Sequence, residues 1–494
     1  MWEAGNGSAG RRALPIQQQT GRPNIGAARR PVWSTLAAIG VAALCNSAAS
    51  AETMQSALVK AYQNNPQLNA QRASARSIDE NVPQALSGYR PKLSITASTG
   101  EEYVSLTSKS PSPFNPGQPV YTNSANFFSP WTVGVTGTQT LFNGFQTANR
   151  TRAAESQVSG AREALRVMEQ TILLNAATAY MDVLRDTANL EVQRSNVRVL
   201  QETLKQTRDR FDVGEVTRTD VAQAEAQLAA GQSAELAAES TLTTSKANYR
   251  QIIGVEPVSL APGSPVDRFF PKNLAASIDL GLTENPNVTS AMAGVDVSFL
   301  QVKINEGALL PVVTAQIAAQ QQSEPFPGLT TEFLGTATAN VTIPIYQGGS
   351  EFSLIRQSKE SLGQQRLTLD LTRNQVRQAV VQAWGQLEAA KAQVVAAQSQ
   401  VTSSEVALNG VREEARVGQR TTLDVLNAQQ ALVNARVALV TAQHDRVVAS
   451  YNVLSAVGRL SPQVLGLATP VYDPMVHYQQ VRDAWVGLRT PDGR

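Results

Sequence analysis

A doubled sequence motif constrains this chain more than any other feature. Residues 211–224 read FDVGEVTRTDVAQA, and residues 415–428 read ARVGQRTTLDVLNA, 204 residues later. In each copy a glycine follows the last residue of a helical pattern, where it can adopt a positive φ and end the helix. A threonine and an aspartate a few residues further on supply N-cap oxygens for a second helix. The motif therefore predicts two helical hairpins, each a tight turn between long helices.

The duplication extends over most of the chain. LFNG at 141–144 matches IYQG at 345–348 at the same offset, whereas Asn65-Pro66 matches Asn285-Pro286 at an offset of 220. The difference, 220 − 204 = 16, gives the first copy 16 extra residues between Pro91 and Leu141. A period of this length is too long for a solenoid. We therefore expect two pseudo-symmetric units, residues 52–270 and 271–460, followed by a C-terminal tail, 461–494.

The N-terminus has the features of a secretory signal. Arg29 and Arg30 precede a short apolar run that begins at Leu36, and Ala49-Ser-Ala51 has the small-x-small form of a cleavage site. We expect residues 1–51 to be a signal peptide with an extended N-region, cleaved after Ala51. Its loss removes five Arg and one Glu, which leaves 37 basic residues (42 − 5), 39 acidic residues (40 − 1) and no cysteine. Disulfides are then excluded. The slight excess of acidic residues argues against a nucleic-acid partner.

Four segments alternate apolar and polar residues with a period of two. They are residues 92–103 and 131–141 in the first unit and residues 312–320 and 333–345 in the second. Strands of about ten residues with one apolar face are typical of a transmembrane β-barrel. A half-buried sheet in a soluble protein shows the same alternation. The Ser/Pro/Asn-rich residues 105–130 are predicted to be a loop.

The other segments have helical periodicity. The longest predicted helices, 146–212 and 350–416, would each be roughly 100 Å long at about 1.5 Å per residue. Apolar residues recur in them every seventh position, which is typical of coiled-coil packing. The returning helices are predicted at 217–253 and 421–457. Shorter helices are predicted at 53–87 and 277–307. The chain is therefore expected to be mainly α, with a β part.

The sequence has few of the residues that catalysis requires. Its two histidines, His444 and His477, are far apart in the chain, and His444 is predicted to lie on a helix surface. There is no phosphate-binding loop, nucleophile elbow or cluster with metal-ligand spacing. We therefore predict that the protein is not an enzyme and has neither a cofactor nor a metal site.

The doubled Val-Gly-x5-Asp-Val turn, the LFNG and IYQG strand ends and the strand–loop–strand–long helix order make the chain resemble the TolC family of trimeric outer-membrane efflux and secretion channels. The resemblance covers residues 52–460, and the tail is similar to α-proteobacterial members. It implies a trimer in which a twelve-stranded transmembrane β-barrel stands on a periplasmic α-helical barrel. It also implies an exit duct of a tripartite efflux pump or a type I secretion system, which exports drugs, small molecules or polypeptides.

The resemblance further implies partners and site residues. The partners would be two further copies of the chain, a periplasmic adaptor (membrane fusion) protein, an inner-membrane transporter of the RND or ABC type, and outer-membrane lipid. The expected pore constriction is formed by Asp424 and Asn427, and the expected aperture interlock by Arg420, Asp220 and Thr219. The expected adaptor contacts are Val213, Gly214, Val417 and Gly418. Asp220 and Asp424 could also serve only as helix N-caps.

Two other classes of protein remain open at this point. A periplasmic adaptor also has a helical hairpin, but typically one hairpin with soluble β domains. A structural coiled-coil protein of the cell envelope would have long helices without needing the four strands. Extraction from the outer membrane as a detergent-dependent trimer distinguishes a channel from both.

Overall fold

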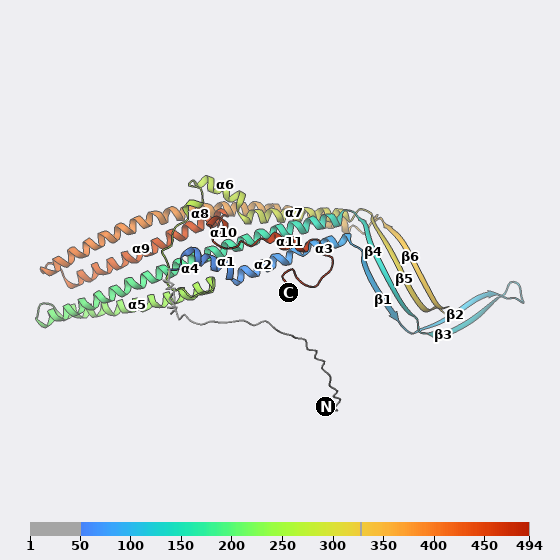
Figure 1. Cartoon of the computed structure of the whole chain (residues 1–494), viewed down its shortest axis with the longest axis horizontal. Coiled ribbons are helices and arrows are strands. Elements are labelled where there is room, and N and C mark those ends of the chain that lie inside the picture. The colour runs from blue at the N-terminus through green and yellow to red at the C-terminus, as the bar shows by residue number, and fades with distance from the viewer. Residues whose placement is uncertain (1–50, 327–328, 494) are drawn as a thin grey trace, which may run out of the picture. The chain divides into compact units, whose positions relative to one another are not determined.

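The computed structural model describes residues 51–326 and 329–493. The predicted signal peptide, apart from Ala51 itself, lies outside the described residues. Residues 51–493 belong to one compact unit. Within it the helices lie side by side, with the two hairpin turns at one end and the strands at the other (Figure 1). Every helix of the described residues is too short or too polar to cross a membrane.

The strands are β1 (Lys92–Thr99), β2 (Glu102–Pro111), β3 (Pro119–Phe128), β4 (Trp131–Asn143), β5 (Val312–Phe326) and β6 (Leu329–Thr342). The helices of the first unit are α1 (Met54–Asn64), α2 (Pro66–Asp79), α3 (Asn81–Leu86), α4 (Gln146–Asp212) and α5 (Arg218–Ile253). The later helices are α6 (Leu274–Glu284), α7 (Pro286–Gly307), α8 (Ser350–Arg416), α9 (Thr422–Val457), α10 (Pro462–Leu465) and α11 (Pro474–Val481). The expected fold class, mainly α with a β part, is confirmed.

One antiparallel sheet contains β1, β4, β5 and β6, in that order. Val135 of β4 pairs with Ile95 of β1 and with Ala319 of β5. Residues directly opposite each other in such a pair point to the same face, and successive residues point to opposite faces. The register therefore gathers apolar side chains on one face: Leu93, Ile95, Trp131, Val133, Val135, Ile317, Phe333 and Val341. All eight are at least 40% exposed, so the sheet has one apolar face that the chain itself leaves uncovered.

The loop predicted over residues 105–130 is wrong. β2 and β3 pair from Glu102↔Phe128 to Pro111↔Pro119, so only residues 112–118 connect them. The predicted strand 92–103 is correspondingly two strands, β1 and β2, separated at residues 100–101. The Ser and Asn residues behind the loop prediction are tolerated in β3 because the strand is exposed along nearly its whole length. This projecting hairpin falls in the stretch where the first unit carries its 16 extra residues.

Each of the two predicted shorter helices, 53–87 and 277–307, is in fact divided at its Asn-Pro pair. Asn65 Oδ1 accepts hydrogen bonds from the N–H groups of Gln67 (2.9 Å) and Leu68 (3.3 Å), which caps α2, and Pro66 occupies its first position. Proline suits that position because its missing N–H would have no helical partner there. Asn285 and Pro286 separate α6 from α7 in the same way. A further break separates α2 from α3 at Glu80, without a side-chain cap. The long helices α4 and α8 have the predicted bounds.

The largest hydrophobic core lies around the middle of α4, which α1, α5 and α9 contact directly, and it continues into residues of α6 and α8. Tyr62, Tyr180 and Tyr249 are among its fully buried side chains. The Tyr180 hydroxyl lies 2.7 Å from the carbonyl oxygen of Glu52 and 2.6 Å from that of Ala261. Burial raises the pKa of Tyr180 to about 12, so its hydroxyl remains a donor at neutral pH. Tyr180 thus fastens the segment just before α1 and the segment after α5 to α4.

The register makes the two faces of the sheet separately testable. Val135→Arg places a charge on the apolar face and should destabilise the protein in bilayers by about 2–4 kcal/mol near the bilayer midplane. Thr136→Arg, one residue further on the opposite face, should cost far less. The measurement is the urea midpoint of the protein folded in phospholipid vesicles. Equal losses for the two variants would contradict this assignment of faces.

Candidate aperture site at the hairpin tips

The turn between α4 and α5 has the geometry of a glycine-ended helix. Gly214 has φ +78°, and its N–H donates to the Phe211 carbonyl (2.9 Å), while the N–H of Glu215 donates to the Arg210 carbonyl (2.9 Å). This pair of bonds is the Schellman motif, which satisfies carbonyls that a helix end leaves free. Gly418, also at φ +78°, is placed identically after α8. The chain reverses at both tips because only glycine adopts this conformation without strain.

Both returning helices begin with a capping box. The Asp424 carboxylate accepts hydrogen bonds from the N–H (3.0 Å) and the hydroxyl (2.9 Å) of Thr421, and Asp220 does the same at Thr217. The backbone N–H and then the hydroxyl of Thr421 hold the pKa of Asp424 below its usual range, and Arg420 contributes a smaller attraction. The hydroxyl and then the N–H of Thr217 lower the pKa of Asp220 similarly. Both aspartates are therefore ionised at neutral pH.

Each turn is braced by an ion pair, and the charges of the two braces are reversed. In the first turn Arg210 at the end of α4 lies 2.7 Å from Glu215 in the loop. In the second turn Glu414 near the end of α8 lies 2.9 Å from Arg420 in the loop. The first loop thus presents carboxylates, and the second presents a guanidinium. Sequence reasoning missed Glu414, although its offset of 204 from Arg210 marks the exchanged charges.

A cleft of about 1010 Å³ separates the two tips of one chain. Arg420 lines it from the second turn, and Asp220 and Glu215 line it from the first. Figure 1 shows the α4–α5 and α8–α9 hairpins apart at this end. Within one chain, Arg420 is paired with Glu414 and Asp220 with Thr217, so the predicted contact between Arg420 and Asp220 is not formed there. Thr219 and Asn427 are exposed.

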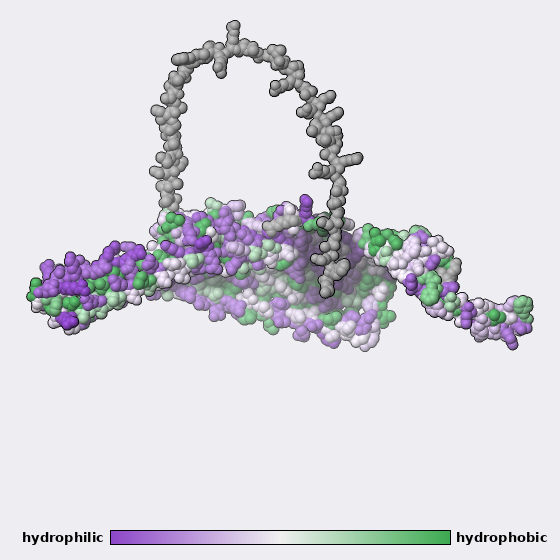
Figure 2. Space-filling model, turned by 90° about the horizontal axis from the view of Figure 1, so that it is seen from below, coloured by the Kyte–Doolittle hydropathy of each residue, from purple (hydrophilic) through white to green (hydrophobic). Residues whose placement is uncertain are grey.

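The predicted adaptor residues lie at the outermost points of the turns. Val213 is 77% exposed and Val417 is 68% exposed. A side chain added at Gly214 or Gly418 would meet no atom within 4 Å. The tips therefore present apolar side chains and open backbone, although Figure 2 shows that most of the surface at this end is hydrophilic.

A partly buried polar network joins the two hairpins farther from the tips. His444 of α9 is buried, which corrects the prediction of a surface histidine. Its Nε2 lies 3.1 Å from Asp182 of α4, and its Nδ1 lies 2.8 Å from Asp445. Arg185 lies 2.9 Å from Asp182 and also contacts Asp186. Sequence periodicity could not reveal this network, because its members come from different helices.

No group of three or more His, Cys, Asp or Glu side chains in residues 51–326 and 329–493 is placed to hold a metal ion.

Comparisons with known proteins identify the family. The family model described as "Outer membrane efflux protein" matches residues 57–255 and 278–459. The chain belongs to the outer membrane efflux protein family. It is 43% identical over 453 residues to the outer membrane efflux protein BepC of Brucella suis, covering 91% of this chain and 95% of BepC. It is 24% identical over 436 residues to the outer membrane protein TolC of Escherichia coli, covering 85% of each.

The fold comparison agrees with this membership. The Campylobacter jejuni CmeC outer membrane channel superposes with a TM-score of 0.71 at 16% identity, covering 87% of this chain and 89% of CmeC. The predicted TolC-like family and outer-membrane location are confirmed. The two segments matched by the family model, 57–255 and 278–459, lie within the predicted units 52–270 and 271–460, and residues 256–277 lie between them. In this outer-membrane channel protein the strands lie at one end of the long helices, and the hairpin tips described above lie at the other (Figure 1).

The network at His444 predicts a pH dependence. Burial lowers the pKa of His444, but the carboxylates of Asp182 and Asp445 outweigh it, and the net pKa is raised. A raised folded-state pKa stabilises the fold fully below the unfolded pKa of about 6.5, and the stabilisation is lost as pH rises through the folded-state value. The thermal midpoint should therefore fall between about pH 5.5 and about pH 8.5.

His444→Gln should flatten this dependence, because glutamine carries no charge at any of these pH values. Asp182→Asn should flatten it too, since it removes a carboxylate that holds the imidazolium. A His444→Gln protein that keeps the wild-type slope would show that the dependence arises elsewhere.

Proposed function

We propose that three copies of this chain form a non-enzymatic exit duct of the outer membrane, used for efflux and type I secretion. The second hairpin of each copy would narrow this duct at its periplasmic end. The observation that carries the proposal is the sheet: one face is apolar and exposed, and the two outer strands, β1 and β6, are paired on one side only. Unpaired backbone groups at a strand edge are not tolerated in lipid. Three copies of a four-stranded sheet supply twelve strands, and pairing β6 with β1 of the next copy removes every edge.

The pseudo-symmetry supports the same closure. At the exit of β4, Gly144 lies so close to Gly307 that an added Cβ would be 2.1 Å from the Gly307 carbonyl oxygen. The counterpart of Gly144 is Gly348, at the exit of β6, and a Cβ there would meet no atom within 4 Å. The counterpart of Gly307, at the offset of 220, is Ser87, which precedes β1. The contact that is closed within the chain at Gly144 is thus open at Gly348. Ser87 carries a Cβ, which at Gly307 would lie 2.3 Å from the Gly144 carbonyl oxygen, so a second copy would have to meet Gly348 in a looser contact.

The constriction is assigned to the second hairpin. Asp424 stands in the first turn of α9 with its carboxylate ionised, and Asn427 is exposed one turn later. Three copies would place three carboxylates around the axis, and rings of carboxylates favour cations. Asn427 would add amide oxygens to the ring without charge.

The interlock is assigned to contacts between tips. The first turn presents Asp220 and Glu215 to the cleft, and the second presents Arg420. These opposite charges suit a contact in which Arg420 exchanges Glu414 for Asp220 and Thr219 of an adjacent tip. An exposed charge pair is worth only about 0–1 kcal/mol, so several such contacts must act together.

Partners below the tips complete the duct. The exposed Val213-Gly214 and Val417-Gly418 pairs suit a periplasmic adaptor protein, which would connect the duct to an inner-membrane transporter of the RND or ABC type. The efflux function named for BepC favours small molecules as cargo. A deletion strain scored for drug sensitivity and for lost secreted polypeptides separates efflux from secretion.

The acidic ring is tested by substitution at its carboxylate. Asp424→Asn keeps a cap oxygen at the start of α9 but removes the charge, so cation selectivity and block by divalent cations should both fall. The measurement is the reversal potential of single channels in a salt gradient. Glu225→Gln, on the first hairpin but outside the proposed ring and the proposed interlock, should leave selectivity in place. An Asp424→Asn channel with unchanged selectivity would mean that Asp424 acts only as a helix cap.

The interlock is tested at its arginine. Arg420→Ser should raise single-channel conductance without loss of the trimer, because the closed tips lose their charge pairs. Arg373→Ser is the matched control, since Arg373 pairs with Asp370 on an exposed face of α8 outside the cleft between the tips. Conductance that rises equally in both variants, or in neither, would argue against a specific role for Arg420.

A further inference from the structure

The C-terminal tail is fastened to the first unit by a series of contacts. His477 Nδ1 lies 2.9 Å from the Asp79 carboxylate, and Asp79 is only 2% exposed. Arg162 of α4 stacks on the Tyr478 ring at 4.9 Å. Arg482 then lies 3.5 Å from Glu155 of α4. The tail thus packs along α2 and α4, and beyond the end of α11 it continues toward the start of the sheet.

A further contact, made by Arg90, holds Trp485 beside the first strand. Arg90 donates to the Ala484 carbonyl (2.6 Å), and its guanidinium lies 4.7 Å from the centroid of the Trp485 ring. Arg90 precedes β1 by two residues, and Leu93 is the first residue of the apolar face. Trp485 therefore lies at the level where the membrane-facing surface begins.

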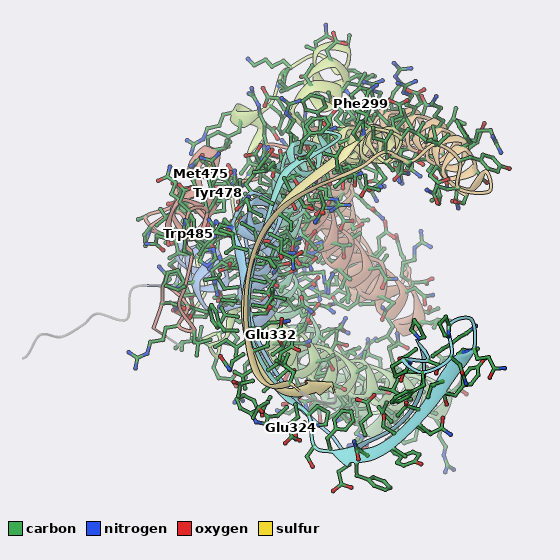
Figure 3. The ribbon with its side chains drawn as sticks, turned by 90° about the vertical axis from the view of Figure 1, so that its right-hand side faces the viewer. Phe299, Glu324, Glu332, Met475, Tyr478 and Trp485 are labelled. Carbon is green, nitrogen blue, oxygen red and sulfur yellow. The ribbon has the colours of Figure 1, made fainter. Side chains whose placement is uncertain are left out.

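The residues around Trp485 are apolar and uncovered. Trp485 is 68% exposed, Val486 95% and Leu488 104%. Figure 3 shows Trp485 on the convex side of the curved sheet, at the periphery of the view. Three more aromatic residues are exposed where the strands meet the helices: Tyr89, Phe145 and Tyr346. Figure 2 shows hydrophobic surface at this junction.

We propose that residues 485–489 are an interfacial anchor that inserts into the periplasmic leaflet of the outer membrane. Tryptophan is enriched at the boundary between headgroups and acyl chains because its ring is apolar and its N–H is polar. Val486 and Leu488 would bury beside it, and Arg489 would remain with the lipid phosphates. Continuity with the apolar face of the sheet favours lipid as the occupant. The inference rests on the proposed orientation, with the helices in the periplasm.

Tryptophan fluorescence tests the anchor in the full trimer. Beyond Ala51 the chain has three tryptophans, Trp131, Trp384 and Trp485. In Trp131→Phe/Trp384→Phe protein, reconstituted in vesicles of phosphatidylcholine with brominated acyl chains, Trp485 should be quenched by lipid and shielded from aqueous acrylamide. The positive control keeps only Trp131, which lies on the apolar face. The negative control carries Val213→Trp as its sole tryptophan, at the hairpin tip.

The outcomes separate the anchor from the proposed orientation. Quenching of Trp485 by brominated lipid several-fold above that of Val213→Trp supports the anchor. Quenching by acrylamide alone overturns it in favour of a solvated tail. Protection of Trp485 from both quenchers overturns the anchor and shows that Trp485 packs against another copy, where the exposed Ile345 and Tyr346 could contact it. If Trp131 is not quenched by lipid either, the membrane placement of the sheet is wrong, and the proposed function fails with it.

Discussion

One asparagine in each unit joins two helices end to end, and the length of the duct depends on these two junctions. Asn65 Oδ1 caps the start of α2, while its Nδ2 donates to the Ile252 carbonyl (3.0 Å) at the end of α5. Asn285 does the same between α7 and Ala456 of α9 (2.8 Å). Each side chain thus satisfies a free N–H group of one helix and a free carbonyl of another, and both groups would otherwise lack helical partners. Helices of 36 residues are extended in this way to run beside partners of 67 residues.

The two units are alike in their helix junctions, turns and caps, and they differ in the β2–β3 hairpin and in the ion pairs at the tips. The junctions, the glycine-ended turns and the capping boxes recur with nearly the same distances in both units. Among the described residues the β2–β3 hairpin is present only in the first unit, and the arginine and glutamate of each brace exchange places between helix and loop. An exact repeat would place like charges on neighbouring tips around a ring. Exchanging the charges would let the tips of the two units attract each other, as the proposed interlock requires.

The sequence was informative where a local rule determines the structure. Gly214 and Gly418 reveal their turns because the conformation needs glycine, and Thr217 and Thr421 reveal their caps by spacing. The bounds of α4 and α8 follow from unbroken periodicity. The Asn-Pro pairs were visible too, yet they were not interpreted as breaks because the helical pattern continues on both sides. The β2–β3 hairpin was missed because its exposed strands have no face to bury, so alternation gives little signal. The partners of Arg420 and His444 depend on contacts that no pattern within one helix encodes.

The Asp424 carboxylate belongs to the capping box of α9 and is also the proposed pore charge, and the two roles are chemically compatible. A cap needs an oxygen directed at the Thr421 N–H, and Asp424 uses Oδ2 for both of its bonds to Thr421. Those bonds favour the ionised form, so they preserve the charge instead of consuming it. The other carboxylate oxygen remains free of the cap. The capping box therefore holds a fixed negative charge in the first turn of α9, as the proposed ring requires.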